Sequence, residues 1–145
     1  MSLFDVSDLV TVKLYYTFKS VDSGKKLVIL EDKKAEELLK DEDKKGEVEV
    51  IESKWRNLNW KEQNEVTEAS YSKFLNTSTG ERQFNFAAYR DAIIKRCLKE
   101  WNLTMNEKPV PVTPGAIDKL PGPVVVDIYQ KFEKYIEFSE EELGN

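Results

Sequence analysis

All five prolines of this 145-residue chain lie between residues 109 and 123, and they divide its C-terminal half into separate segments. Proline has no backbone N–H and its ring clashes with the preceding helical turn, so a helix that precedes Pro109 cannot continue through this stretch. Two local signals restart helices within it. Thr113-Pro114 is a favoured N-cap and first-turn pair for a short helix that reaches Leu120, and Gly122-Pro123 repeats the signal for a last helix.

The segments on either side of the prolines carry apolar residues at helical spacing. Residues 84–101 are predicted to form one amphipathic helix, with an apolar face of Phe86, Tyr89, Ile93, Ile94, Cys97, Leu98 and Trp101. Residues 123–138 are predicted to form a second, with a stripe of Val124, Val125, Ile128, Phe132, Tyr135 and Ile136. We expect the two helices to pack antiparallel around a hinge at Trp101–Pro123, with Trp101 as the anchor.

The last helix has more apolar side chains than one narrow helix–helix seam accommodates. This surplus indicates a binding surface for another protein or for a second copy, on the outer face of that helix. Trp60 is a further candidate, because tryptophan is enriched at binding hot spots, although a core or cap position is the alternative. The predicted protein-binding residues are Trp60, Val124, Tyr129, Tyr135 and Phe138.

The N-terminal part has the composition of a small antiparallel sheet. Residues 10–19 are rich in β-branched and aromatic types, and the turn residues 22–24 separate them from a second apolar run at 26–30, which predicts a hairpin. Apolar residues and glutamates alternate over residues 48–52, which predicts a third strand. Residues 32–39, between the hairpin and this strand, are expected to form a short helix. Asn59 and Glu62 resemble a capping box that opens a helix over 60–74.

These patterns predict an α+β fold in a single domain over residues 1–145. The β-rich part covers residues 1–57, the helical part residues 58–138, and an acidic tail residues 139–145. The acidic runs 41–43 and 140–142 are interpreted as solvated surface.

The absence of histidine argues against an enzyme, since it removes the usual general base, the usual metal ligand and every Ser-His or Cys-His nucleophile. No phosphate-binding glycine loop or calcium loop is present either. Cys97, the only thiol, falls on an apolar helix face and is predicted to be buried and structural. We therefore expect no catalytic residue, no cofactor and no metal.

The net charge of −5, with lysine and arginine interleaved among acids, argues against nucleic acid and membrane surfaces as partners. No apolar run approaches the roughly 20 residues that span a bilayer, and residues 1–5 lack the features of a signal peptide. A single cysteine fits a reducing compartment. These features predict a cytoplasmic location.

One resemblance covers residues 58–138. The runs Leu58–Gln63, Tyr89-Arg90, Glu100–Leu103, Pro109–Thr113 and Ile117–Pro121 resemble tail assembly chaperones of long-tailed bacteriophages. Similar runs occur in small virion or assembly proteins from the same gene neighbourhood. The matching residues look like scaffold positions, namely Trp60, Trp101, Leu103, Pro111, Thr113, Leu120 and Pro121.

The resemblance implies a protein of the infected bacterium's cytoplasm that binds the apolar helices of the tape-measure protein until the tail tube assembles, and that often self-associates. The alternative is a structural protein of the virion, in the neck, tail or head, which docks onto neighbouring subunits. An enzyme and a small inhibitor of a host protein are less favoured alternatives.

Overall fold

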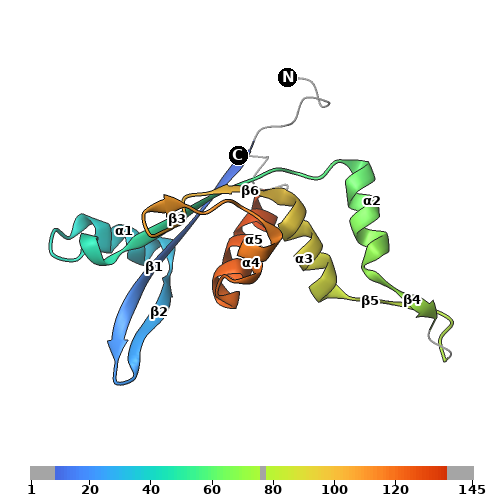
Figure 1. Ribbon diagram of the computed structural model, residues 1–145, viewed down its shortest axis with the longest axis horizontal. Coiled ribbons are helices and arrows are strands. Elements are labelled where there is room, and N and C mark those ends of the chain that lie inside the picture. The colour runs from blue at the N-terminus through green and yellow to red at the C-terminus, as the bar shows by residue number, and fades with distance from the viewer. Residues whose placement is uncertain (1–8, 76–77, 137–145) are drawn as a thin grey trace.

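The computed structural model describes residues 9–75 and 78–136, and it shows the expected α+β fold (Figure 1). Its centre is a four-stranded antiparallel sheet in the order β2-β1-β3-β6. The strands are β1 (Val10–Val21), β2 (Gly24–Leu30), β3 (Glu49–Trp55) and β6 (Leu98–Trp101). The first three come from the N-terminal part, as predicted, whereas β6 comes from the C-terminal half.

The predicted N-terminal hairpin is confirmed. Strands β1 and β2 pair from Tyr15 opposite Leu30 to Val21 opposite Gly24, and the two intervening residues form the turn. Gly24 has a φ of 139°, which side-chain-bearing residues rarely adopt, so glycine suits this position. Helix α1 (Asp32–Lys40) follows, as predicted, and contacts β1 with Ala35 fully buried.

The main core lies on the other face of the sheet. Alternate side chains of β1 and β3 point to this face, and helix α5 (Gly122–Ile136) packs chiefly on β1 to cover them. Trp55 of β3 stacks on Phe132 of α5, with ring centroids 4.7 Å apart. The other buried core residues include Val12, Leu14, Ile51, Ile93, Ile94, Cys97 and Ile128.

The predicted helix at 84–101 is too long at its C-terminal end. Helix α3 covers Phe86–Cys97, and the next four residues form β6, which pairs with β3 through a bulge. A strand here gains backbone hydrogen bonds to β3, which a further helical turn would not make. The last two helices therefore do not bury their stripes mainly against each other, because the sheet is the principal partner of α5.

The proline-rich connection is pinned to the sheet. The Trp101 indole N–H donates to the Val110 carbonyl at 2.5 Å, and the Asn102 amide donates to the Val50 carbonyl at 3.0 Å. The Thr113 hydroxyl accepts from the Ala116 N–H, so the predicted N-cap is confirmed. This connection contains the small hairpin of β7 (Thr104–Met105) and β8 (Lys108–Pro109), followed by the short helix α4 (Pro114–Asp118).

The single turn η2 (Lys45–Glu47) lies in the charged segment between α1 and β3, just after the acidic run 41–43. Its residues are not buried, in agreement with the solvated surface predicted for this region.

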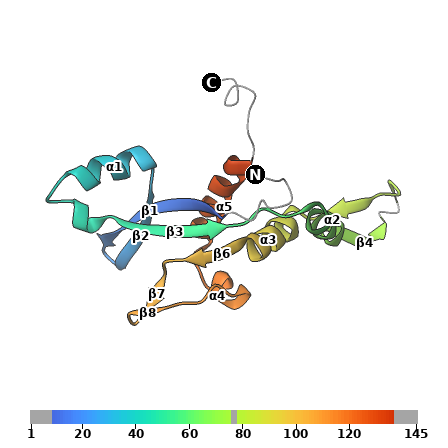
Figure 2. The same cartoon turned by 90° about the horizontal axis from the view of Figure 1, so that it is seen from above.

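Helix α2 (Trp60–Ala69) and the hairpin of β4 (Tyr71–Leu75) and β5 (Arg82–Phe84) form an arm that extends away from the sheet (Figures 1 and 2). The expected helix at 60–74 is therefore wrong beyond Ala69. The Ser70 hydroxyl donates to the Val66 carbonyl at 2.7 Å where the helix ends, and the residues that follow pair with β5 instead.

Candidate protein-binding cleft

A cleft of about 490 Å³ lies between α2, α3 and α5, and we call it the three-helix cleft. Its floor is buried core, including Ile93, Cys97 and Phe132, whereas Tyr135 and Ile136 on its rim are 55% and 49% exposed. The remaining lining residues are Val10, Asn57, Leu58, Gln63, Tyr89, Tyr129 and Glu133. Such a mixture of many apolar groups and a few polar ones is typical of binding sites.

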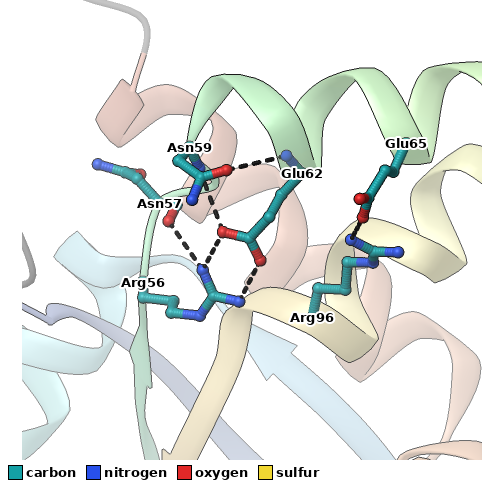
Figure 3. Close-up of polar contacts among 6 residues, drawn as sticks. All are labelled: Arg56, Asn57, Asn59, Glu62, Glu65 and Arg96. Carbon is teal, nitrogen blue, oxygen red and sulfur yellow. Dashed lines mark hydrogen bonds and ion pairs between the residues drawn. The ribbon is translucent and has the colours of Figure 1, made fainter.

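The start of α2, which forms one wall, is held by a network of charged and polar groups (Figure 3). The Arg56 guanidinium donates two hydrogen bonds to the Glu62 carboxylate, at 2.8 and 2.5 Å. Asn59 and Glu62 complete the predicted capping box, with the side-chain Oδ1 of Asn59 accepting from the Glu62 N–H at 2.9 Å. These bonds lower the pKa of Glu62 to about 2, chiefly through the hydrogen bond from Arg56.

Two further contacts connect α2 to α3. The Gln63 amide donates to the Tyr89 hydroxyl at 2.9 Å, and both side chains line the cleft. Arg96 of α3 donates to Glu65 at 3.1 Å (Figure 3). The wall formed by α2 is therefore attached to α3 mainly by polar bonds, because Val66 is the only buried residue of α2.

Cys97 lies on the floor with 1% of its surface exposed, which confirms its predicted burial. Burial raises the pKa of its thiol to about 11, so the thiol is neutral near pH 7. Since the thiolate is the nucleophile, this position suits packing better than covalent chemistry.

The predicted binding residues differ in position and in exposure. Tyr129 and Tyr135 both line the three-helix cleft, and Trp60 is 78% exposed at the start of α2. Val124 and Tyr129 are only 3% and 8% exposed, so the expected exposure of these two side chains is wrong. Helix α5 packs on the sheet as well as near α3, so more of its apolar side chains are buried than a contact between two helices would allow. Phe138 lies outside the described residues.

Exposed apolar side chains on the arm and at the start of α3 were missed. Phe74 and Phe86 are 83% and 78% exposed, and Leu75 is 63% exposed. Phe86 contacts Phe84 edge-on, which in turn contacts Tyr71 across the hairpin. The usable signal was the polar run ending at Gly80 between two aromatic segments, which is typical of a hairpin turn.

Comparisons of this chain with protein-family models, with curated proteins and with solved structures found no match. Within residues 9–75 and 78–136, no helix is long and apolar enough to cross a membrane. The same residues contain no group of three or more histidine, cysteine or acidic side chains arranged to hold a metal ion.

Proposed function

We propose that this protein is a non-enzymatic chaperone of bacteriophage tail assembly, which binds apolar helical segments of the tape-measure protein in the three-helix cleft. The observation that carries the proposal is the apolar cleft whose rim residues, Tyr135 and Ile136, remain half exposed. The resemblance of residues 58–138 to tail assembly chaperones supports the choice of partner. The proposed location is the cytoplasm of the infected cell.

The chemistry of the cleft suits an amphipathic helix. Such a helix presents apolar side chains at positions i, i+3, i+4 and i+7, which fit a groove walled by other helices. Tyr129 and Phe132 provide an aromatic floor for these side chains, and Tyr135 lies one turn from Phe132 at the rim. Gln63 and Glu133 supply polar groups at the same cleft, where the polar edge of a bound helix would lie.

The test is co-expression with a tape-measure protein of the same phage. The soluble yield of the tape-measure protein is expected to rise severalfold with the wild-type chain and to fall back with Ile136→Asp, because a charge at the rim penalises apolar binding. Met105→Asp is the matched control: Met105 is 68% exposed in β7, outside the cleft lining, and its replacement should leave the yield unchanged. A yield that does not respond to the wild-type chain would refute the proposal.

A structural protein of the virion is the second candidate. The observation that favours it is the β1–β2 hairpin, which projects from the sheet (Figure 1) and exposes Phe18 and Val21 by 52% and 46%. Among the described residues, the outer side of β2 pairs with no strand, so neighbouring subunits have an edge to dock on. Mass spectrometry of purified particles separates the candidates: a chaperone is absent from mature virions, and a structural protein is present at a fixed copy number.

Self-association is compatible with either function. The exposed Phe74 of the arm and Phe86 at the start of α3 offer apolar area for a second copy. Light scattering across a range of protein concentrations would measure the oligomeric state, and Phe74→Ser is expected to weaken any oligomer held by the arm.

A further inference from the structure

Strand β1 is paired on only one side along its first half. Strand β3 pairs with it from Val10 to Tyr16, whereas the pairing of β2 begins only at Tyr15. Within the part of the chain that the structure describes, the side of residues 10–14 that faces away from β3 therefore has no strand partner. We call this side the β1 edge.

The polar backbone groups at the β1 edge are available to a new strand. The Lys13 carbonyl accepts a hydrogen bond from the Lys131 ammonium of α5 at 2.9 Å, so this carbonyl points away from β3. In an antiparallel sheet the N–H and C=O of one residue point to the same side, and every second residue repeats this direction. Thr11 and Lys13, both exposed, therefore direct their N–H and C=O groups to the β1 edge.

A groove of about 690 Å³ runs beside these residues, between β1, the start of α1 and the end of α5. Its charged lining residues are three lysines and one aspartate, namely Lys13, Lys131, Lys134 and Asp32. Lys131 pairs with Asp32 and Asp127 at 3.3 Å each, and Lys13 pairs with Glu52 at 3.5 Å. Lys134 makes no ion pair with any described residue, so its charge is available to a ligand.

We propose that the β1 edge binds an extended acidic segment of a partner protein, which adds to the sheet as a strand along residues 10–14. Backbone hydrogen bonds to Thr11 and Lys13 provide the pairing, and the lysines of the groove select acidic side chains. On binding, the Lys131 ammonium leaves the Lys13 carbonyl to an N–H of the incoming strand and contacts a carboxylate instead. The groove shares Tyr135 with the three-helix cleft, but it takes an extended segment, whereas the cleft suits a helix.

The first test uses the full chain and two synthetic peptides, Val-Glu-Val-Glu-Val-Glu-Val and its lysine counterpart. The acidic peptide is expected to slow hydrogen exchange at the Thr11 and Lys13 amides at least tenfold and to bind at least tenfold more tightly than the basic one. If Lys131 serves only to protect the edge from pairing, neither peptide slows exchange, and the proposal is overturned. Equal binding of both peptides overturns the charge selection.

The second test removes one backbone donor. Thr11→Pro deletes an N–H that faces the β1 edge and not β3, so the sheet should tolerate it. It is expected to weaken acidic-peptide binding at least tenfold, whereas Thr11→Val, which keeps the N–H, should not. Equal affinity of the two variants contradicts strand addition. Should Thr11→Pro fail to fold, an acidic peptide N-methylated at alternate residues tests the same pairing on the unmodified chain, with loss of binding expected and full binding contradictory.

Discussion

Glu62 makes hydrogen bonds to both Arg56 and Asn59 at the start of α2. Its carboxylate accepts from Arg56 and from the Asn59 N–H, and its own N–H donates to the Asn59 side chain. The side chains of Arg56 and Glu62 are 31% and 22% exposed, so water screens this ion pair only in part. The pKa of Glu62 is about 2, against an ordinary value of 4.5, because these surroundings stabilise the ionised carboxylate.

Acid should therefore weaken the fold through Glu62. Because its pKa is lowered in the folded state, the ionised carboxylate stabilises the protein above pH 4.5, and this contribution is lost as the pH falls from 4.5 toward 2. Allowing for partial exposure, we expect Glu62→Gln to cost about 1–2 kcal/mol of unfolding free energy at pH 7 and little at pH 2. Urea unfolding at the two pH values measures this.

Glu65→Gln is the matched control, since the Arg96–Glu65 pair is more exposed, at 39% and 48%. Its expected cost is below about 0.5 kcal/mol at either pH. Equal costs for the two substitutions would contradict the special role of Glu62.

At the scale of elements, the ends of helices were predicted less well than their starts. The caps at Asn59 and Thr113 were found because a cap is a local bond between neighbouring residues. The residues after Ala69 and after Cys97 continue an apolar pattern that fits either a helix or a short strand. Pairing with β5 makes the first segment a strand, and pairing with β3 makes the second segment a strand. Neither pairing can be read from the residues of the segment itself.

The turn of the β7–β8 hairpin has a preferred asparagine at its first position but a glutamate at the second, where glycine is favoured. Asn106 and Glu107, between the paired Met105 and Lys108, have φ of 52° and 66°. Two-residue hairpin loops with positive φ at both positions favour Asn-Gly, because a side chain such as that of glutamate is strained there. We expect Glu107→Gly to raise the free energy of unfolding by about 0.5–1 kcal/mol.

Glu107→Ala serves as the control for this element, because it removes the same side-chain atoms beyond Cβ but keeps the strain. Thermal unfolding of the three proteins should place the alanine variant with the wild type or below it. A gain for alanine as large as that for glycine would mean that the glutamate side chain, and not the backbone conformation, limits the turn.

For the whole molecule, the contact between Trp55 and Phe132 connects the sheet to the last helix. Both side chains are essentially unexposed, at 0% and 1%, and their rings stack with an interplanar angle of 19°. The Trp55 indole N–H donates to the Ser53 hydroxyl at 2.8 Å, and that hydroxyl donates to the Val12 carbonyl. Strands β1 and β3 and helix α5 thus meet in one buried cluster.

Phe132→Ala should be among the most destabilising substitutions in the chain. Loss of a buried phenylalanine leaves a cavity and is expected to cost about 3–5 kcal/mol, and Phe132→Leu should cost less because it fills part of that volume. Phe74→Ala, in the exposed arm, should change the free energy of unfolding by less than about 0.5 kcal/mol. Urea unfolding measures all three, and a similar cost at Phe74 and Phe132 would contradict the assignment of the core.

Features that depend on near neighbours in the chain could be predicted from the sequence. It predicted the N-terminal hairpin, the helix starts, the proline break and the burial of Cys97, because turns, caps and periodicity act within a few residues. It also named Trp60 and Tyr135 as binding candidates, and both side chains are exposed in the fold. Long-range packing was needed to show that Leu98–Trp101 is a strand, that Val124 and Tyr129 are buried, and where the three-helix cleft and the β1 edge lie. An apolar side chain can pack against any apolar surface, so the sequence pattern does not show which element covers it. Here the sheet covers a face of α5 for which the helical periodicity indicated no packing partner.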